Sequence, residues 1–320
     1  MLASVPLLEL PTASRPAAGF ATRLQAAWRD FGFVGIRGHG IAPAVIAAGL
    51  ATARAFFALP EAIKRRYEVV GGAGQRGYTR FRVEKARDQR AADLKEFWHV
   101  GREVGRDHPL AAMLLPNLWP DEVLGFQSAQ LALFAELERL GSALLSALAP
   151  TLGLPIDWFA RRIAQGNSIL RSIHYPPLPA AGATGADLLG AAVRAAAHED
   201  INLITLLVGS DEPGLEILTR QGDWLPITTL PGTIVVNVGD MLQRLTNGVL
   251  PSTTHRVVNP PPPWDARSRH SIPFFLHFEP EVVIEPLASC VSDATPARWP
   301  PIRVHDYLQE RLREIGLVAD

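Results

Sequence analysis

The chain has 320 residues, of which 48% are hydrophobic and 20% are charged, so it can build a full hydrophobic core as one large domain or two smaller ones. Its formal net charge of -1 gives no reason to expect a nucleic acid or an anionic membrane as a partner. No apolar run is long enough to span a bilayer, and the amino terminus lacks the pattern of a secretory signal. The single cysteine, Cys290, excludes an internal disulfide, so we expect a cytoplasmic protein.

The first half of the chain predicts helices and a few strands. Residues 1–120 are expected to form an α/β segment, with a strand over 5–10, a helix around 24–28, a strand over 32–36 and a helix from Pro43. The glycine-dense stretch 71–77 predicts a loop. Large apolar residues then recur at near-heptad spacing between Phe126 and Leu148, which predicts a long packing helix within residues 121–166.

Residues 167–285 predict a β-rich core, because short runs of β-branched and aromatic residues alternate there with turn residues. The expected strands cover residues 169–175, 201–208, 215–218, 224–227, 233–238, 256–258 and 271–278. Many short strands at close spacing are typical of a sandwich or barrel, and here they favour a jelly roll. The expected fold class is mainly β with flanking helices, and residues 286–320 are expected to form a helical extension.

Two histidines and one aspartate suggest a metal site. His198 and Asp200 are separated by one residue, and residues i and i+2 of a strand project to the same face, so Glu199 would turn away. His255 follows much later and must come from a different strand. Two imidazoles and one carboxylate suit Fe(II), because on one octahedral face they leave half of the coordination shell open for substrate and dioxygen. Zinc uses similar ligands, and the three residues alone do not separate the two metals.

A second group of residues suits a carboxylate ligand. Arg269 and Ser271 share one face of the last predicted strand, where a guanidinium and a hydroxyl offer charge-assisted hydrogen bonds to an acid. For an isolated arginine, a surface salt bridge is the alternative. Tyr175 ends an earlier strand and offers another hydroxyl, but a core tyrosine that caps the following turn fits equally well.

Residues after the glycine-dense loop are candidates for contact with a substrate. Tyr78, Phe81 and two arginines, Arg80 and Arg82, form an aromatic-arginine cluster that would recognise an acidic or planar compound. An ordinary solvated strand is the alternative, and it is slightly favoured. Phe275, on the inward face of the last strand, is expected to pack inside the barrel close to the metal.

Together these features resemble the isopenicillin N synthase-like branch of the Fe(II)/2-oxoglutarate-dependent dioxygenases. The likeness covers almost the whole chain, and its most specific part is carboxy-terminal. The matching stretches are 27–33, 38–41, 77–78, 93–97, 170–177, 231–232, 237–240, 245–248, 252–259 and 269–271, in the order of the family.

The resemblance implies a distorted double-stranded β-helix, a cupin-like jelly roll, as the catalytic core over 167–285. It assigns His198, Asp200 and His255 to Fe(II) as the catalytic centre, Arg269 and Ser271 to the distal carboxylate of 2-oxoglutarate, and Tyr175 to the same cosubstrate. It implies an enzyme that uses O2 to hydroxylate or otherwise oxidise a small molecule while 2-oxoglutarate is decarboxylated to succinate and CO2. We expect neither a nucleic acid nor a membrane as a partner.

Three departures from the family pattern leave alternatives open. Glu199 stands where plant members carry threonine, although it should not touch the metal. The connection from Leu178 to Ala197 is longer than expected and is predicted to form a short helix or a lid. The Arg-x-Ser pair also occurs in isopenicillin N synthase and aminocyclopropane-carboxylate oxidase, so an iron oxidase that does not use 2-oxoglutarate is the first alternative. A non-catalytic jelly-roll binding protein is the second. The sequence determines neither the substrate nor the oligomeric state.

Overall fold

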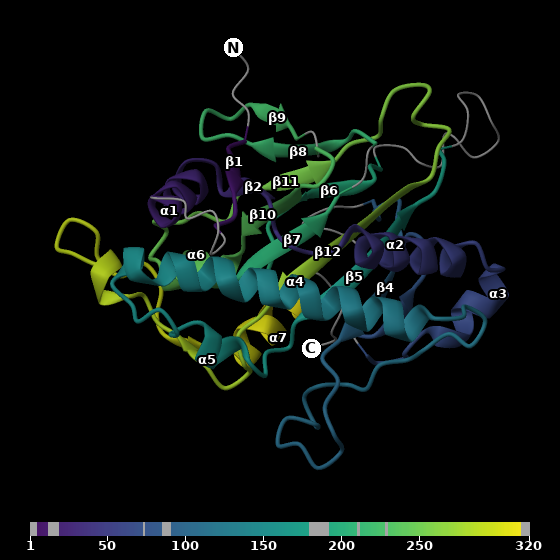
Figure 1. The fold of residues 1–320 in the computed structure, drawn as a ribbon, viewed down its shortest axis with the longest axis horizontal. Helices are drawn as coiled ribbons and strands as arrows, with labels where there is room; N and C mark the ends of the chain where they lie inside the picture. Colours follow the sequence, from purple (N-terminus) through teal and green to yellow (C-terminus); the bar gives the residue numbers. More distant parts are fainter. Residues whose placement is uncertain are drawn as a thin grey trace.

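Two β-sheets lie at the centre of the computed structural model (Figure 1). The structure describes residues 5–11, 19–72, 74–84, 91–178, 192–209, 212–227 and 230–314. The larger sheet has the order β1-β2-β10-β7-β12-β5-β4-β3, namely Leu7–Glu9, Phe33–Arg37, Ile234–Val238, Ile204–Val208, Arg269–Leu276, Ile169–Tyr175, Glu96–Gly101 and Gly77–Thr79. The smaller sheet has the order β6-β11-β8-β9, namely Ala195–His198, His255–Val257, Leu215–Leu218 and Trp224–Pro226. The predicted jelly-roll core with flanking helices is confirmed.

The strands of the larger sheet separate two environments. In β12, Ile272, Phe274 and Leu276 join the apolar core beneath the helices. Arg269 and Ser271 alternate with them and line a cavity on the other side, between the two sheets. Because successive side chains of a strand point to opposite faces, the same eight residues supply both the core and the polar interior.

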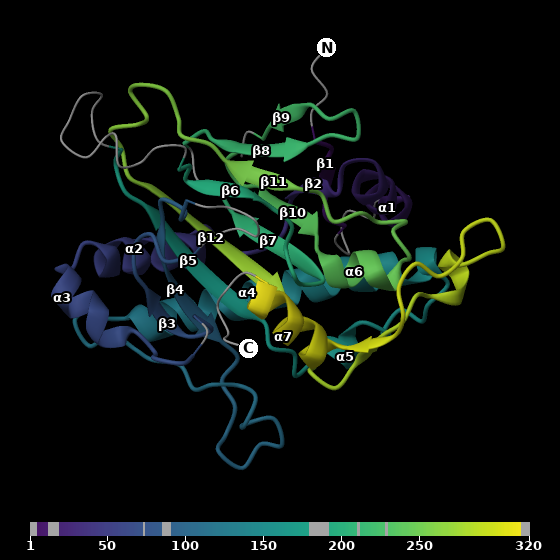
Figure 2. The same ribbon diagram turned by 180° about the vertical axis from the view of Figure 1, so that it is seen from behind.

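Helices cover the outer face of the larger sheet. The longest, α4 (Phe126–Leu148), lies beside α2 (Pro43–Phe57) across this face, and α1 (Phe20–Phe31) packs near one edge (Figure 1). The close approach of α4 needs a glycine, since a Cβ on Gly141 would lie 2.8 Å from Cδ2 of Leu276. Viewed from behind, α7 (Val304–Glu314) lies on the opposite side of the sheet from α4 (Figure 2).

Short elements complete the described chain. They are α3 (Glu61–Lys64), α5 (Ala160–Ile163), α6 (Asp240–Leu245), the strands β13 (Val283–Ile284) and β14 (Ile302–Arg303), and 3-10 turns at Arg65–Tyr67, Ala149–Leu152 and Ala288–Cys290. Among the described residues, no single helix has the length and apolar character needed to cross a membrane. One pair, Pro43–Phe57 with Glu61–Tyr67, meets those requirements only when joined across a bend of 109°.

Most predicted elements match those observed, although the strand β4 and the helix α6 were not predicted and other segments differ from expectation. The helix expected within 121–166, with its end near Gly153, spans Phe126–Leu148, and a 3-10 turn at Ala149–Leu152 continues it to the left-handed Gly153 (φ 74°). The expected lid over 178–197 falls mainly on residues 179–191, which lie outside the described residues, and its last part forms the unpredicted strand β6. The carboxy-terminal segment contains β14 as well as a helix.

The two ends of α1 are both left-handed glycines with different surroundings. Gly32 (φ 69°) caps the helix through its N–H to the carbonyl of Trp28, and its own carbonyl accepts the N–H of Val238. A Cβ there would lie 2.8 Å from Cβ of Thr253 and closer still to its hydroxyl. Gly19 (φ 70°) has no atom within 4 Å of such a Cβ. Alanine substitutions at Gly19 and Gly32 therefore distinguish the cost of backbone strain from the cost of steric overlap.

We predict that Gly32→Ala lowers the free energy of unfolding by roughly 2–5 kcal/mol, from left-handed strain plus overpacking. Gly19→Ala should cost only the strain, about 1–2 kcal/mol. Urea denaturation measures both losses. The slope of the unfolding free energy against urea concentration, the m value, should stay unchanged. Equal losses for the two variants would contradict the predicted role of the contact with Thr253.

Candidate active site

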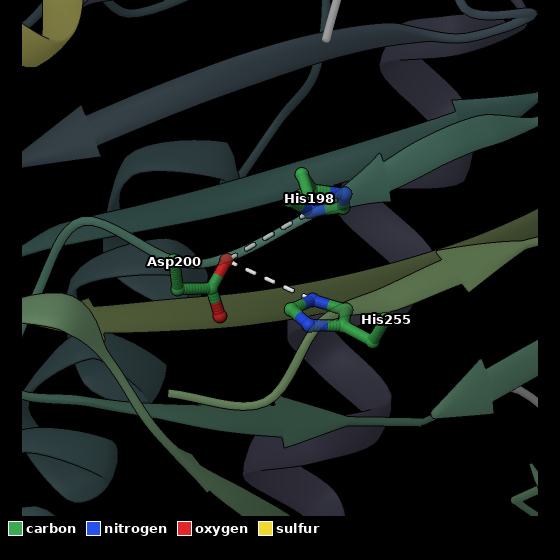
Figure 3. A group of neighbouring side chains, drawn as sticks. All are labelled: His198, Asp200 and His255. Carbon is green, nitrogen blue, oxygen red and sulfur yellow. Dashed lines mark ion pairs between the residues drawn. The ribbon is translucent and has the colours of Figure 1, made fainter. Parts of the chain in front are cut away.

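The two histidines of the predicted metal site face each other across a strand pair. His198 is the last residue of β6, His255 is the first of β11, and the two are direct partners in the antiparallel register. Their ring centroids are therefore only 4.4 Å apart. Asp200 lies beyond the end of β6, so the expectation that it shares a strand with His198 is wrong. The chain turns after His198 and still brings the carboxylate to the same side (Figure 3).

The ligand atoms are spaced for one metal ion. Oδ1 of Asp200 lies 3.8 Å from Nε2 of His198 and 3.8 Å from Nε2 of His255 (Figure 3). Two ligands that bind one ion at about 2.0–2.2 Å lie at most about 4.4 Å apart, so these separations suit a shared ion. The three ligand atoms all lie within 4.8 Å of one another.

Both imidazoles are oriented by a carbonyl two residues earlier in the chain. Nδ1 of His198 donates to the carbonyl of Ala196 at 2.7 Å, and Nδ1 of His255 donates to that of Thr253 at 3.1 Å. A carbonyl oxygen only accepts hydrogen bonds, so the proton lies on Nδ1 in each ring. The lone pair of each Nε2 is therefore available to a metal.

The carboxylate of Asp200 is oriented by the larger sheet. Its Oδ2 accepts the hydroxyl of Thr205 in β7 at 2.5 Å and the amide of Asn237 in β10 at 2.8 Å. Oδ1 is thus left facing the histidines. Neither orienting residue was predicted, although Asn237 is a polar residue inside the apolar run Ile234–Val238 and sits at an inward position, which is the signal that could have found it.

The protonation states suit a cationic ligand. Burial, and then the neighbouring His255, lower the pKa of His198 to about 4. Burial acts to raise the pKa of Asp200, but the two histidines and the hydrogen bonds from Asn237 and Thr205 outweigh it and lower that pKa. The set is therefore a carboxylate with an uncharged His198 at neutral pH, as Fe(II) requires.

A small cavity of about 70 Å³ joins this metal site to the predicted carboxylate-binding residues. Arg269 and Tyr175 are cross-strand partners, and Cζ of Arg269 lies 5.0 Å from the tyrosine ring centroid. Nη1 of Arg269 lies 3.4 Å from Oγ of Ser271. The guanidinium is buried, and its Nε has no hydrogen-bond partner among the described residues. A buried arginine without a carboxylate has donors to offer to an incoming anion.

Arg194 is a second buried cation that the sequence did not reveal. Its Cζ lies 5.9 Å from the ring centroid of Tyr175. The guanidinium groups of Arg194 and Arg269 therefore both lie near that ring. It is completely buried, and its Nε and Nη1 have no partner among the described residues. Burial, and then the nearby Arg269, lower its pKa. Arg194 thus adds positive potential beside the cavity, and nothing in its alanine-rich surroundings signals this.

A larger cavity of about 410 Å³ lies on the other side of the metal site. The two cavities share five lining residues, whereas Leu308 and Arg311 of α7 line only the larger one. The shared residues are Lys95, Arg171, His198, Asp200 and Phe275. One wall is polar and is built from Glu84, Asp93, Lys95, His99 and Arg171. A volume of this size suits a small organic molecule.

Of the five predicted substrate residues, only Phe275 lies at this cavity. The hydroxyl of Tyr78 donates to Glu96, and Tyr78 and Phe81 line a separate cavity. Arg80 is exposed and lies 3.7 Å from Glu68, and the backbone N–H of Arg82 donates to the carbonyl of Lys95. None of these four residues lines the larger cavity.

We predict that Asn237→Ala weakens metal binding about 10- to 100-fold, because the carboxylate of Asp200 loses its orienting amide. Anaerobic calorimetric titration with Fe(II) measures the affinity. The matched control is Asn117→Ala. It removes an amide that bonds to the backbone of Gly101 and contacts none of the three metal ligands. Equal affinities for the native protein and the Asn237 variant would contradict the orienting role.

The polar wall also predicts a pH dependence. Burial acts to raise the pKa of Glu84, but Arg171 and Lys95 outweigh it and hold that pKa well below the ordinary value of 4.5. A lowered folded-state pKa contributes stability above pH 4.5 that is lost as the pH falls. The difference in unfolding free energy between the native protein and Glu84→Gln should therefore shrink between about pH 6 and pH 3 in denaturant titrations. A constant difference would contradict this assignment.

Comparisons with known proteins agree with the geometry. Residues 5–122 match the family of the N-terminal domain of non-haem dioxygenases in morphine synthesis. Residues 166–278 match the 2OG-Fe(II) oxygenase superfamily. A 2-oxoglutarate-Fe(II) type oxidoreductase of Aspergillus fumigatus is 31% identical over 308 residues, which cover 94% of this chain and 88% of that protein.

Two solved structures extend the likeness to three dimensions. A Caulobacter crescentus protein assigned to the 2OG-Fe(II) oxygenase family has a TM-score of 0.88 and 43% identity, covering 99% of this chain and 100% of that one. A full-length Neurospora crassa protein, solved in complex with alpha-KG and thymine, has a TM-score of 0.84 and 27% identity, covering 97% and 96%. The double-stranded β-helix core, the 2-oxoglutarate cosubstrate and the iron site formed by His198, Asp200 and His255 all follow from this likeness and the observed triad. The chain belongs to the 2OG-Fe(II) oxygenase superfamily and is a 2-oxoglutarate-dependent dioxygenase.

Proposed function

We propose that this dioxygenase hydroxylates, or otherwise oxidises, a small molecule while 2-oxoglutarate is converted to succinate and CO2. In a hydroxylation, one atom of O2 enters the substrate and the other enters succinate, so atoms and electrons balance. The observation that carries the proposal is the position of the metal ligands between two cavities, of about 70 and 410 Å³. Two organic molecules can thus lie beside the same metal ion.

The smaller cavity suits the cosubstrate. Arg269 would donate to the carboxylate farthest from the metal, with the hydroxyl of Ser271 beside it and Tyr175 closing the same wall. A cation at this end selects a diacid over a monoacid such as pyruvate, because the monoacid would leave the buried guanidinium unpaired. Arg194 strengthens the same electrostatic preference.

The larger cavity suits the substrate. When bound, Fe(II) supplies the activation of O2 and the redox chemistry. Three side chains would hold it, and Phe275 and α7 line the cavity beside it. The similar Neurospora crassa protein, which binds alpha-KG and thymine, supports a small molecule in this position.

We predict that Arg269→Ala weakens 2-oxoglutarate binding about 100-fold, which is the cost of roughly 3 kcal/mol for losing one partner of a buried charged pair. Anaerobic addition of Fe(II) and 2-oxoglutarate should give a visible charge-transfer band in the native protein, and its titration gives the affinity. Arg256→Ala is the control, because Arg256 pairs with Glu216 on the smaller sheet and does not line the cavity. A band that saturates equally in Arg269→Ala would contradict the role of Arg269. Oxygen consumption without any 2-oxo acid would instead favour an iron oxidase.

A further inference from the structure

Two carboxylates that line the larger cavity, Glu84 and Asp240, each have a buried oxygen atom without a hydrogen-bond partner among the described residues, and Glu84 is the one held between two cations. Oε1 of Glu84 accepts hydrogen bonds from Lys95 at 3.0 Å and from Nη1 of Arg171 at 3.2 Å. Oε2 is buried and has no hydrogen-bond partner among the described residues. A buried carboxylate oxygen without a donor is unfavourable, so its retention at a cavity wall points to a ligand that supplies one.

Glu84 belongs to the same wall as the metal ligands. Lys95 bridges it to Asp93, whose Oδ2 lies 2.8 Å from the lysine nitrogen. Oδ1 of Asp93 accepts the N–H of Ala196 at 3.0 Å, and the carbonyl of Ala196 orients His198. A short chain of contacts therefore runs from Glu84 to His198. Both residues line the larger cavity, so a molecule bound to Oε2 of Glu84 shares that cavity with the iron site.

Arg171 is held rigidly next to the free oxygen. Its Nε donates to His99 at 2.5 Å, and its Cζ lies 4.2 Å from the ring centroid of Phe97 and 5.2 Å from that of Phe275. Its third nitrogen, Nη2, makes no hydrogen bond to any described residue. The pair of Glu84 and Arg171 thus presents an acceptor and a donor side by side, which is the complement of an N–H next to a C=O.

The charged residues of this polar wall balance one another, while Glu199, Asp240 and Arg311 line other parts of the cavity. Two carboxylates, Glu84 and Asp93, face two cations, Lys95 and Arg171. His277, another buried residue of this cavity, has an unpartnered Nδ1 within the described part of the chain, and burial lowers its pKa to about 4, so it is uncharged. A charged substrate would upset this balance in a buried place, whereas an uncharged hydrogen-bond donor would not.

We propose that the substrate is an uncharged compound with an amide-type N–H, such as a lactam or a cyclic imide, which donates to Oε2 of Glu84. The inference rests on the proposed function, because it names the class of molecule that this oxygenase oxidises. Glu84 is then the residue that determines specificity, and Arg171 donates a hydrogen bond to the neighbouring carbonyl oxygen. Carboxylic acids of the same size should be excluded.

The test is calorimetric binding to the protein loaded with Fe(II) and 2-oxoglutarate without oxygen. The probes are 2-pyrrolidinone, 2-piperidone, succinimide, glutarimide and uracil, each with its N-methylated analogue, and cyclopentanecarboxylate and benzoate. We expect at least one N–H compound to bind, its methylated analogue to bind about tenfold more weakly or worse, and Glu84→Gln to weaken the N–H compound about 10- to 100-fold. Glu216→Gln, which removes a carboxylate paired with Arg256, should leave binding unchanged.

Several outcomes would overturn the inference. They are binding of a carboxylate in place of the N–H compounds, equal binding of a methylated analogue, an unchanged affinity in Glu84→Gln, and no binding by any probe. The charge-transfer band with 2-oxoglutarate is recorded on each sample. A missing band in the native protein would contradict the proposed function itself, whereas a normal band in Glu84→Gln shows that the iron and cosubstrate sites of the variant are intact.

Discussion

The antiparallel pairing of β6 with β11 is the constraint on which the active site depends, because it sets His198 opposite His255. Each strand carries its own means of orienting its histidine, a carbonyl two residues earlier that fixes the proton on Nδ1. The pairing therefore has only to bring two already oriented rings together. Asp200 is oriented separately, by Thr205 and Asn237 of the larger sheet. A metal bound there joins the two sheets, so metal affinity and the packing of the barrel are coupled.

The same alternation of side chains that builds the core beneath the helices places charged groups beside a second apolar cluster between the two sheets. Apolar residues on the outer face of the larger sheet are covered by α1, α2 and α4, and this burial stabilises the fold. The inner face can then hold charged groups that cost stability. Most of these are paired, as Lys95 is with Asp93 and Glu84. Arg269 has no carboxylate partner among the described residues, so a dicarboxylate ligand relieves a cost that is already present.

The two cavities share part of their walls and differ in the segments that complete them. The smaller cavity is enclosed by central strands, including β5 and β12, which carry Tyr175 and Arg269. The larger one is completed by the segment before β4, which carries Glu84, and by α7 at the carboxy-terminal end. Arg171 of β5 and Phe275 of β12 complete the same cavity from the central strands.

The sequence by itself determined most strands of the core, but not β4 or β6, and it determined the three metal ligands and the shared strand face of Arg269 and Ser271. These depend on local patterns, since strand alternation decides which side chains share a face and ligand chemistry is a property of residue type. The tertiary structure alone decided that Asn237 orients Asp200, that Arg194 lies beside Tyr175 and that Glu84 lines the cavity at the iron site. Each of these contacts joins segments far apart in the chain. It depends on how strands pair and how loops close over them, and no short pattern records that geometry.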